Sequence, residues 1–409
     1  MINTGDTAWV LVSSALVLLM TPGLAFFYGG MVRKKNMLSI LMQCFIVMCV
    51  LSLQWVLFGY SLSFGPGKGF WGGLSWLGLN GVTLEPYADY AGTIPHQAFM
   101  IYQGMFAIIT PALIIGAFAE RMKFSAFLVF TLLWATFVYN PLCHWVWGAG
   151  GWLKNLGALD FAGGTIVHIN AGMAALVTAL VIGPRKNLNS NIPAPHNLPF
   201  VVLGTGLLWF GWFGFNAGSA LSANGLAVNA FVVTNTAAAA AGLSWAALEW
   251  LRNGKPTMFG TASGVVAGLV AITPAAGFVS VIPAIIIGLL VSVFCFTAVS
   301  IIKPKLGYDD SLDAFGVHCV GGIWGALATG LFASEAVNAA GANGLFFGNP
   351  RQFAIQALTV LVTLVYTFTV TFVIYKLVDI VIGVRVGAKE ESMGLDLTQH
   401  RERAYTVLE

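Results

Sequence analysis

The chain has 409 residues, of which 58% are hydrophobic and only 9% are charged, and its net charge is +3. Soluble domains carry about 25% charged residues, so the composition excludes a soluble globular protein and predicts a polytopic membrane protein. We expect every span to be α-helical, because a helix satisfies its own backbone hydrogen bonds in lipid. The sequence has none of the short alternating segments that a membrane barrel requires.

Eleven apolar runs are long enough to cross a hydrocarbon layer, which takes about 20 helical residues. They lie at about 8–31, 38–64, 97–119, 124–147, 162–183, 198–219, 226–250, 258–276, 280–302, 315–334 and 352–385. The last run is the longest, and we expect it either to be steeply tilted and wrap the other helices or to continue into the cytoplasm. The chain is therefore predicted to be an all-α membrane domain over residues 1–386, followed by a tail at 387–409.

The basic residues are divided very unevenly between the two sets of loops. One set, together with the tail and the inner end of the last span, holds Arg33, Lys34, Lys35, Arg121, Lys123, Arg185, Lys186, Arg252, Lys255, Lys303, Lys305, Lys376, Arg385, Lys389, Arg401 and Arg403. The other set holds Lys68, Lys154 and Arg351. Because basic loops favour the cytoplasmic side, we predict an outside N-terminus, a cytoplasmic C-terminus and a location in the plasma (cytoplasmic) membrane. Such termini require an odd number of spans, which eleven satisfies.

Two stretches that each carry a histidine are similar to one another. Asp160-Phe-Ala-Gly-Gly-Thr-Ile-Val-His168 opens the fifth span, and Asp313-Ala-Phe-Gly-Val-His318 opens the tenth. A five-span unit that is repeated in sequence must be inverted in the membrane, so we predict two inverted repeats, about 8–183 and 198–334, with the eleventh helix, about 352–385, outside them. Ionisable side chains at membrane depth mark a path for a polar substrate. Both histidines are therefore expected to line a pore.

Other residues in the spans could contribute to such a pore. Five aromatic residues are candidates: Tyr102, Phe106, Trp147, Trp212 and Phe215. Aromatic residues in spans usually serve packing, but their faces can also hold a desolvated cation. The hydroxyl of Ser219 could accept a hydrogen bond from a cation that carries N–H groups. Asp160 is expected to cap the fifth span by accepting its first free N–H groups, and its charge would also attract cations.

Taken together, these stretches resemble the ammonium transporter family (Amt and Mep proteins, with Rh proteins as distant relatives). The resemblance covers nearly the whole chain and is carried by Pro22-Gly-Leu-Ala-Phe-Phe-Tyr-Gly-Gly30, residues 116–121, 160–168, 211–219 and 315–318, and Gly394-Leu-Asp396. It implies eleven helices around a narrow pore in each subunit of a homotrimer, with ammonium or methylammonium as the substrate. We expect no enzyme activity, cofactor, metal or nucleic acid, because the sequence has no phosphate-binding loop, metal triad or nucleophile elbow.

The resemblance also implies roles for the candidates at the outer end. Trp147, Phe106 and Ser219 match an external site that recruits ammonium. Phe106 and Phe215 match two stacked rings that close the outer end of the pore. Tyr102 stands where many relatives carry phenylalanine, and we expect its hydroxyl to be added to the external vestibule.

Deeper in the pore, His168 and His318 match twin histidines that share a hydrogen bond, and Trp212 matches a pore-lining position close to them. Asp160 matches a carboxylate that transport requires. The resulting hypothesis is that NH4+ binds outside, loses a proton near the phenylalanine gate, crosses as NH3 and is protonated again inside. Neutral ammonia is far cheaper to desolvate than an ion, and potassium has no proton to shed. Whether the proton also crosses stays open.

Two other functions are compatible with the same residues. An ammonium sensor usually carries an output domain, for which a tail of 23 residues is too short. An Rh-like passive gas channel would not need the Trp147 and Ser219 pair. The tail is equally compatible with a disordered end and with a docking or regulatory segment. By resemblance, the expected partners are the lipid bilayer and a cytoplasmic PII-type nitrogen-signalling protein.

Overall fold

The computed structural model describes residues 1–67, 69–186 and 195–405, and this part of the chain is helical, without a β-strand. Its α-helices are α1 (Thr4–Met31), α2 (Met37–Gln54), α3 (Tyr60–Phe64), α4 (His96–Phe118), α5 (Phe124–Trp134), α6 (Asn140–Trp147), α7 (Trp152–Leu156), α8 (Asn170–Ile182), α9 (Leu198–Ala217), α10 (Gly225–Asn253), α11 (Met258–Ile272), α12 (Val281–Thr297), α13 (Lys303–Leu306), α14 (Val320–Phe332), α15 (Pro350–Val381), α16 (Ala388–Met393) and α17 (Leu395–His400). Among the outer basic residues, Lys68 lies outside the described residues, as does the end of the tail, 406–409.

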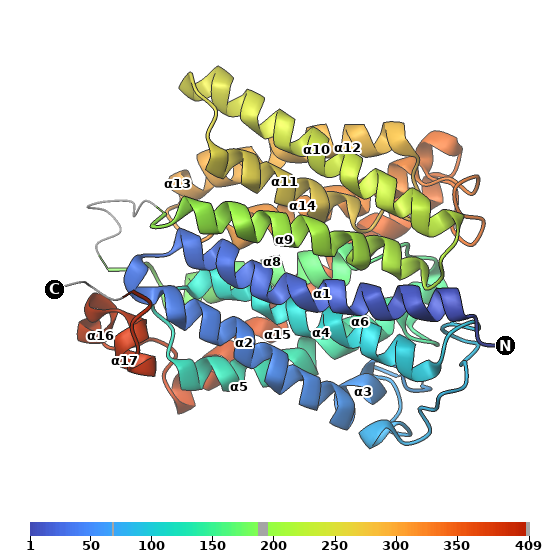
Figure 1. Ribbon diagram of the computed structural model, residues 1–409, viewed down its shortest axis with the longest axis horizontal. Helices are drawn as coiled ribbons and strands as arrows, with labels where there is room; N and C mark the ends of the chain where they lie inside the picture. The colour runs from blue at the N-terminus through green and yellow to red at the C-terminus, as the bar shows by residue number, and fades with distance from the viewer. Residues whose placement is uncertain (68, 187–194, 406–409) are drawn as a thin grey trace.

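The helices account for all eleven predicted spans. Within the described residues, ten helical runs are long and apolar enough to cross a membrane, and α11 is a shorter apolar helix of 15 residues. This eighth span was predicted to continue to residue 276, but its helix ends at Ile272. Pro274 follows closely and lacks the N–H that a further helical turn would need. The start of α1 and the last described helix, α17, lie at opposite ends of the bundle (Figure 1), as an odd number of crossings requires.

Helices α1 and α9 lie side by side and run in opposite directions (Figure 1). Glycines let them approach closely. A Cβ atom built on Gly204 would lie 2.3 Å from the backbone nitrogen of Phe27, and one on Gly211 would lie 2.2 Å from the Met20 side chain. Such small residues allow two helix backbones to pack in direct contact. This pair joins the first half of the chain to the second.

The neighbour relations of the first five spans recur in the next five. Helix α1 contacts α2 and α4, just as α9 contacts α10 and α11, and α4 contacts α8 as α11 contacts α14. Two of the π-helical segments also recur: Ala135–Tyr139 and Gly164–Ile169 in the fourth and fifth spans correspond to Ala298–Ile302 and Phe315–Cys319 in the ninth and tenth, whereas Trp55–Gly59 in the second span has no counterpart in α10. Because α1 and α9 are antiparallel, this pattern is the one that an inverted repeat would produce.

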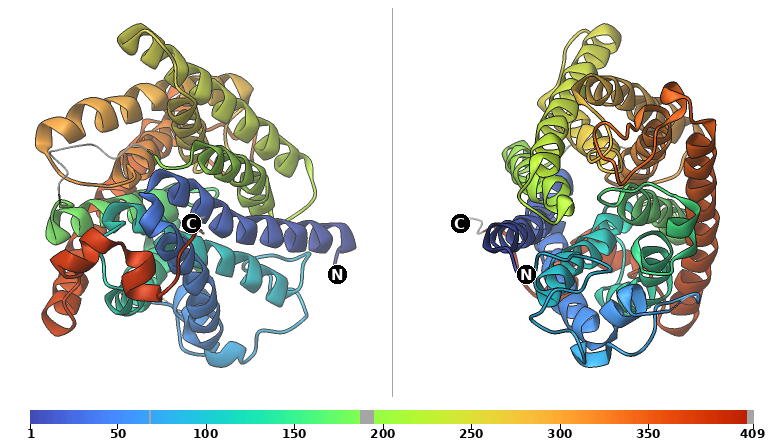
Figure 2. Two further views of the ribbon diagram at one scale, coloured as in Figure 1. Left: turned by 60° about the vertical axis from the view of Figure 1, so that its left-hand side comes forward. Right: turned by 90° about the vertical axis from the view of Figure 1, so that its right-hand side faces the viewer.

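Helix α15 lies along one side of the bundle and touches both halves (Figure 2). It has 32 residues, which corresponds to about 48 Å at 1.5 Å per residue. The amide of Gln356 donates to the carbonyl of Leu159 at 2.7 Å and to that of Ala326 at 3.2 Å. One side chain of α15 therefore connects the fifth span to the tenth.

The tail is folded through its described part, so its interpretation as a disordered end is wrong for residues 387–405. Helix α17 packs against the start of α2, and α16 packs against α17. The backbone N–H of Leu395 donates to Asn36 at 2.8 Å, and that of Ser39 donates to the carboxylate of Asp396 at 2.8 Å. The first N–H groups of a helix lack intrahelical partners and attract negative charge, which explains why Asp396 docks there.

Candidate functional site

Five of the predicted residues form a continuous file of rings through the bundle. Trp147 meets Phe106 edge-on, with 5.7 Å between ring centroids, and Phe106 lies 4.4 Å from Phe215. The Phe215 ring is 5.9 Å from His168, and His168 is 5.4 Å from His318. These residues come from α4, α6, α9 and the starts of the fifth and tenth spans. The fold thus brings together side chains that lie up to 212 residues apart in the sequence.

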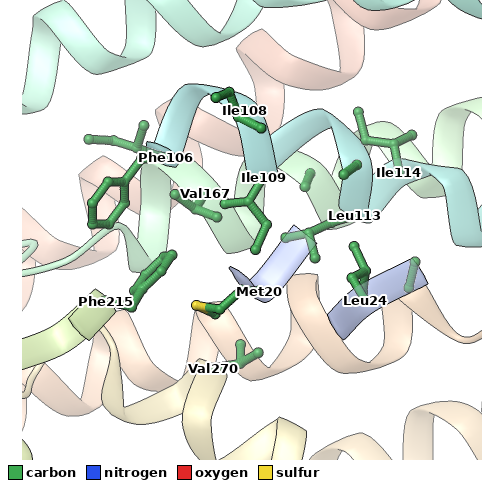
Figure 3. Packing of buried hydrophobic residues seen from close by; sticks show 14 of the residues in the cluster. Met20, Leu24, Phe106, Ile108, Ile109, Leu113, Ile114, Val167, Phe215 and Val270 are labelled. Atoms are coloured by element: carbon green, nitrogen blue, oxygen red, sulfur yellow. The ribbon is translucent and has the colours of Figure 1, made fainter. Parts of the chain in front are cut away.

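Apolar side chains surround the inner part of this file. Figure 3 shows the rings of Phe106 and Phe215 next to Val167 and Met20, with further apolar side chains following along the bundle. The narrow cavity between Phe215 and His318 is walled mainly by Met20, Leu24, Ile109, Leu113, Val167 and Leu208. Besides apolar groups it meets only His168, His318 and Trp212. A second cavity continues from His318 to Asp313 at the other end. The two cavities share Phe27, Val266 and His318 in their linings, and few polar groups face either of them.

The two histidine rings lie nearly parallel, and among the described residues the predicted hydrogen bond between them is not formed. Their ring planes are inclined by 18°. Among the described residues, both ring nitrogens of His168 lack a hydrogen-bond partner, and so does Nδ1 of His318, although both side chains are buried. Each histidine therefore keeps donor and acceptor capacity for a guest in the path.

Asp160 organises the helix start that carries His168. Its carboxylate accepts the N–H groups of Gly163, Gly164 and Thr165 at 2.8, 2.6 and 2.8 Å, and also the hydroxyl of Thr165. Its backbone carbonyl accepts the indole N–H of Trp147 at 2.8 Å. The Asp160 carboxylate thus accepts hydrogen bonds from the first N–H groups of the helix, as expected of a cap. The same residue fixes the outer aromatic ring and the turn that leads to the histidine.

The hydroxyl of Tyr102 does not open into a vestibule, which corrects the prediction. The Tyr102 side chain is fully buried, and its oxygen lies 2.9 Å from the carbonyls of Gly214 and Phe215 and 3.1 Å from Ser219 Oγ. Ser219 in turn donates to the Phe215 carbonyl at 2.8 Å. The last carbonyls of a helix have no intrahelical partner, so both hydroxyls are held at the end of α9. Tyr102 orders Ser219 and the Phe215 backbone.

Trp212 is held beside His168 by a residue that the sequence did not single out. Its ring stacks on His168 at 5.4 Å and 23°, and its indole N–H donates to the hydroxyl of Thr273 at 2.9 Å. Thr273 donates to the carbonyl of Leu269 at 2.8 Å. Nothing in the local sequence marks this threonine, because its partner lies 61 residues away.

At the start of the tenth span, the residue that corresponds to Asp160 is not the predicted one. The sequence comparison matched Asp313 with Asp160, but the carboxylate that accepts a first-turn N–H is that of Asp310, from Phe315 at 2.7 Å. Asp310 precedes His318 by eight residues, as Asp160 precedes His168. This equal spacing is the signal that could have identified it. Asp313 instead forms an ion pair with Lys303 at 2.5 Å.

A buried ionic cluster lies at the end of the bundle where most basic residues gather. Glu120 binds Arg33 at 2.8 Å and Arg185 at 3.2 Å, and Arg185 also binds Asp309 at 2.9 Å. Burial alone would raise the pKa of both carboxyl groups. The hydrogen bonds and charges of the arginines outweigh that effect and hold each pKa below its ordinary value of 4.5 for Glu120 and 3.8 for Asp309. Sequence reasoning counted these cations but not their carboxylate partners.

The whole chain is similar to one group of known proteins. A family model described as Ammonium Transporter Family matches residues 8–405. The chain is 55% identical to the ammonium transporter of Bacillus subtilis over 401 residues, which are 98% of each chain. Its fold is similar to that of Saccharomyces cerevisiae Mep2, at 39% identity and a TM-score of 0.89 over 95% of this chain and 89% of that chain. A sensor Amt protein is similar at 31% identity and a TM-score of 0.89, over 97% and 98% of the two chains. With these matches and the ring file described above, the chain belongs to the ammonium transporter family.

Proposed function

We propose that this protein transports ammonium across the plasma membrane, and that the file of rings from Trp147 to His318 is its path. The single observation that carries this proposal is the apolar cavity whose polar contacts are limited to His168, His318 and Trp212. A cation cannot exchange its hydration water for this apolar lining, because moving an unpaired charge into apolar surroundings costs far more free energy than moving a neutral polar molecule. The path therefore favours a guest that can become neutral by giving up a proton.

The outer end is suited to receive the cation. Trp147 is partly exposed and meets the buried ring of Phe106 at 90°, and a desolvated cation over the face of such a ring gains about 2 kcal/mol. Ser219 remains partly exposed while its hydroxyl proton is directed to Phe215, so its free lone pair can accept an N–H. NH4+ can use both contacts. A potassium ion can be coordinated by the same oxygen, but it has no proton to give up before the apolar part of the path.

The closed pair of phenylalanines is where the proton would leave. Phe106 and Phe215 are fully buried and 4.4 Å apart, so a guest must displace them and lose its water. NH3 then passes His168 and His318, whose unpartnered nitrogens can accept from and donate to it in turn. It takes up a proton again beyond His318. Asp160, by fixing the turn before His168, would be needed for this geometry.

We further propose that the protein acts as a homotrimer and that a cytoplasmic PII-type protein binds its inner face. The support is the family membership and the folded tail, which places α16 and α17 beside the basic residues Lys34 and Lys35. Sensing is a distinct possibility because a sensor Amt protein has the same fold. Transport and sensing differ in whether net substrate crosses the bilayer.

The test is ammonium-evoked current and methylammonium uptake in proteoliposomes that contain the purified protein. We expect saturable uptake that excludes potassium, and loss of uptake or of potassium exclusion in His168→Ala. Saturable binding without uptake would identify a sensor, and uptake without current would identify passive gas conduction. Unchanged, selective uptake by His168→Ala would refute the proposed path.

A further inference from the structure

The two helix starts that carry the histidines match at several positions counted from the histidine. Each π-helical segment ends one residue after its histidine, at Ile169 and at Cys319. Five residues before each histidine the backbone is left-handed, with φ of 110° at Gly163 and 61° at Asp313. In both, the carbonyl of that left-handed residue accepts the N–H four residues later, at 2.8 and 2.9 Å. Eight residues before each histidine stands a carboxylate that accepts first-turn N–H groups.

This correspondence assigns Asp313 the place of Gly163, and Asp310 the place of Asp160. A left-handed backbone is uncommon in residues other than glycine, but aspartate adopts it more readily than most. Asp313 therefore shapes the turn with its backbone while its side chain binds Lys303. Asp310 is fully buried, and it is the residue whose carboxylate reaches the helix.

The two carboxylates differ in how well they are satisfied. Asp160 accepts from three backbone N–H groups and a hydroxyl. Asp310 accepts from Phe315 through Oδ2, and its Oδ1 is buried without a partner among the described residues. Its backbone carbonyl accepts from Lys303 at 2.6 Å. A buried carboxylate with one oxygen that lacks a partner is expensive to keep, and the hydrogen bond that the Asp310 carboxylate accepts among the described residues is the one from Phe315.

We propose that Asp310 is a positioning residue for conduction: by binding the N–H of Phe315 it sets the turn that presents His318 to His168. This inference rests on the proposed function, in which both histidines line the path. His318 lies three positions after Phe315, and its ring lines both cavities of the path. A shift of the turn would change both the width of the path and the stacking distance of the histidines.

The experiment compares four variants in proteoliposomes, each normalised to folded protein by gel filtration. Asp310→Ala removes the acceptor, Asp310→Glu displaces it by one methylene, and Asp310→Asn keeps an acceptor oxygen at the same distance. Glu249→Gln is the matched control, because Glu249 is also buried and accepts a backbone N–H, from Thr257 at the start of α11, at 2.7 Å. The two readouts are ammonium-evoked current and the ratio of that current to the potassium-evoked current.

We expect Asp310→Ala and Asp310→Glu to lower the ammonium current on the order of tenfold or more, since misplacing a group by about 1 Å can cost roughly a hundredfold. Their current ratio should also fall, which mere loss of folded protein would not cause. Asp310→Asn and Glu249→Gln should stay close to the unmodified protein. If Asp310→Ala does not fold, the contrast between Asp310→Glu and Asp310→Asn decides.

Wild-type current and potassium exclusion in folded Asp310→Glu or Asp310→Ala would overturn the inference. His318→Ala in the same assay separates this failure from that of the proposed function. If His318→Ala changes selectivity while the Asp310 variants do not, only the role of Asp310 is wrong. If His318→Ala also behaves as the unmodified protein, the proposed path itself is wrong.

Discussion

Single residues in this protein are held by partners that lie far away in the sequence, and Thr273 shows what one such contact contributes. Its hydroxyl accepts the indole N–H of Trp212, which stacks on His168. In Thr273→Val that N–H stays buried without an acceptor, which costs about 1–3 kcal/mol. We expect a lower melting temperature and slower methylammonium uptake, whereas Thr273→Ser should retain both. Equal uptake by Thr273→Val and the unmodified protein would show that Trp212 needs no anchor.

Asp310 gives a stability prediction that is separate from its role in conduction. Burial raises its pKa from 3.8 to about 6, with Lys303 opposing and Asp313 reinforcing the shift; Tyr28 and Tyr308 also face it. Between pH 6 and 4 the folded state therefore binds more protons than the unfolded state, so this group makes the fold more stable as the pH falls. Two pKa units correspond to about 3 kcal/mol.

Asp310→Asn removes this buried charge and should melt at a higher temperature than the unmodified protein at pH 7.5. The difference should shrink as the pH is lowered to 4, because the unmodified carboxyl becomes protonated. Thermal unfolding in detergent at both pH values, with Glu249→Gln measured in parallel, tests the prediction. A difference between the Asn variant and the unmodified protein that does not depend on pH would contradict it.

At the scale of elements, the contact between α1 and α9 depends on glycine on one face of α9. In Gly204→Val the new Cβ would lie 2.3 Å from the nitrogen of Phe27, and backbone cannot move aside cheaply. Gly206 lies on the same helix with nothing within 4 Å of a built Cβ. We expect Gly204→Val to prevent stable folding, and Gly206→Ala to be neutral or to stabilise the helix by about 0.5–1 kcal/mol. Fluorescence-detected gel filtration of both variants measures this, and a monodisperse Gly204→Val protein would contradict it.

The spans could be predicted from sequence because the length of an apolar run is a local property. The helix ends followed equally local signals, such as Pro274 after α11. The order of the tail could not be predicted this way, because α16 and α17 have six residues each and are held by Asn36 and Ser39 from the other end of the chain. Their own composition is polar and mixed in charge.

The site was predictable to the extent that its residues lie in recognisable stretches. The ring file from Trp147 to His318 was found in this way. The orientation of a hydroxyl could not be predicted in this way. The Tyr102 hydroxyl points into the protein because the end of α9 has carbonyls without intrahelical partners. Asp310 was missed because the two similar stretches were compared from Asp160 and Asp313 onward, and the spacing of eight residues before each histidine was not used.

At the scale of the whole molecule, the inner ionic cluster joins segments from both halves of the chain. Glu120 follows the third span, Arg185 follows the fifth, and Asp309 precedes the tenth. Asn36, which binds the tail through Leu395, also donates to Glu120 at 2.9 Å. A change in the charge of Glu120 is therefore expected to weaken contacts within both halves of the chain and with the tail.

Glu120→Gln would leave Arg33 and Arg185 without their shared carboxylate. Breaking one partner of a buried ion pair costs about 3–5 kcal/mol, so we expect a clearly lower melting temperature at pH 7. Because the pKa of Glu120 and that of Asp309 are lowered in the folded state, their stabilisation is complete above the ordinary value of 4.5 and is lost as the pH falls through the lower folded values. The unmodified protein should therefore lose stability steeply below about pH 4, and Glu120→Gln should show a shallower acid limb. Conversely, parallel acid limbs for the two proteins would mean that Glu120 is not the carboxylate that holds the inner ends of the halves together.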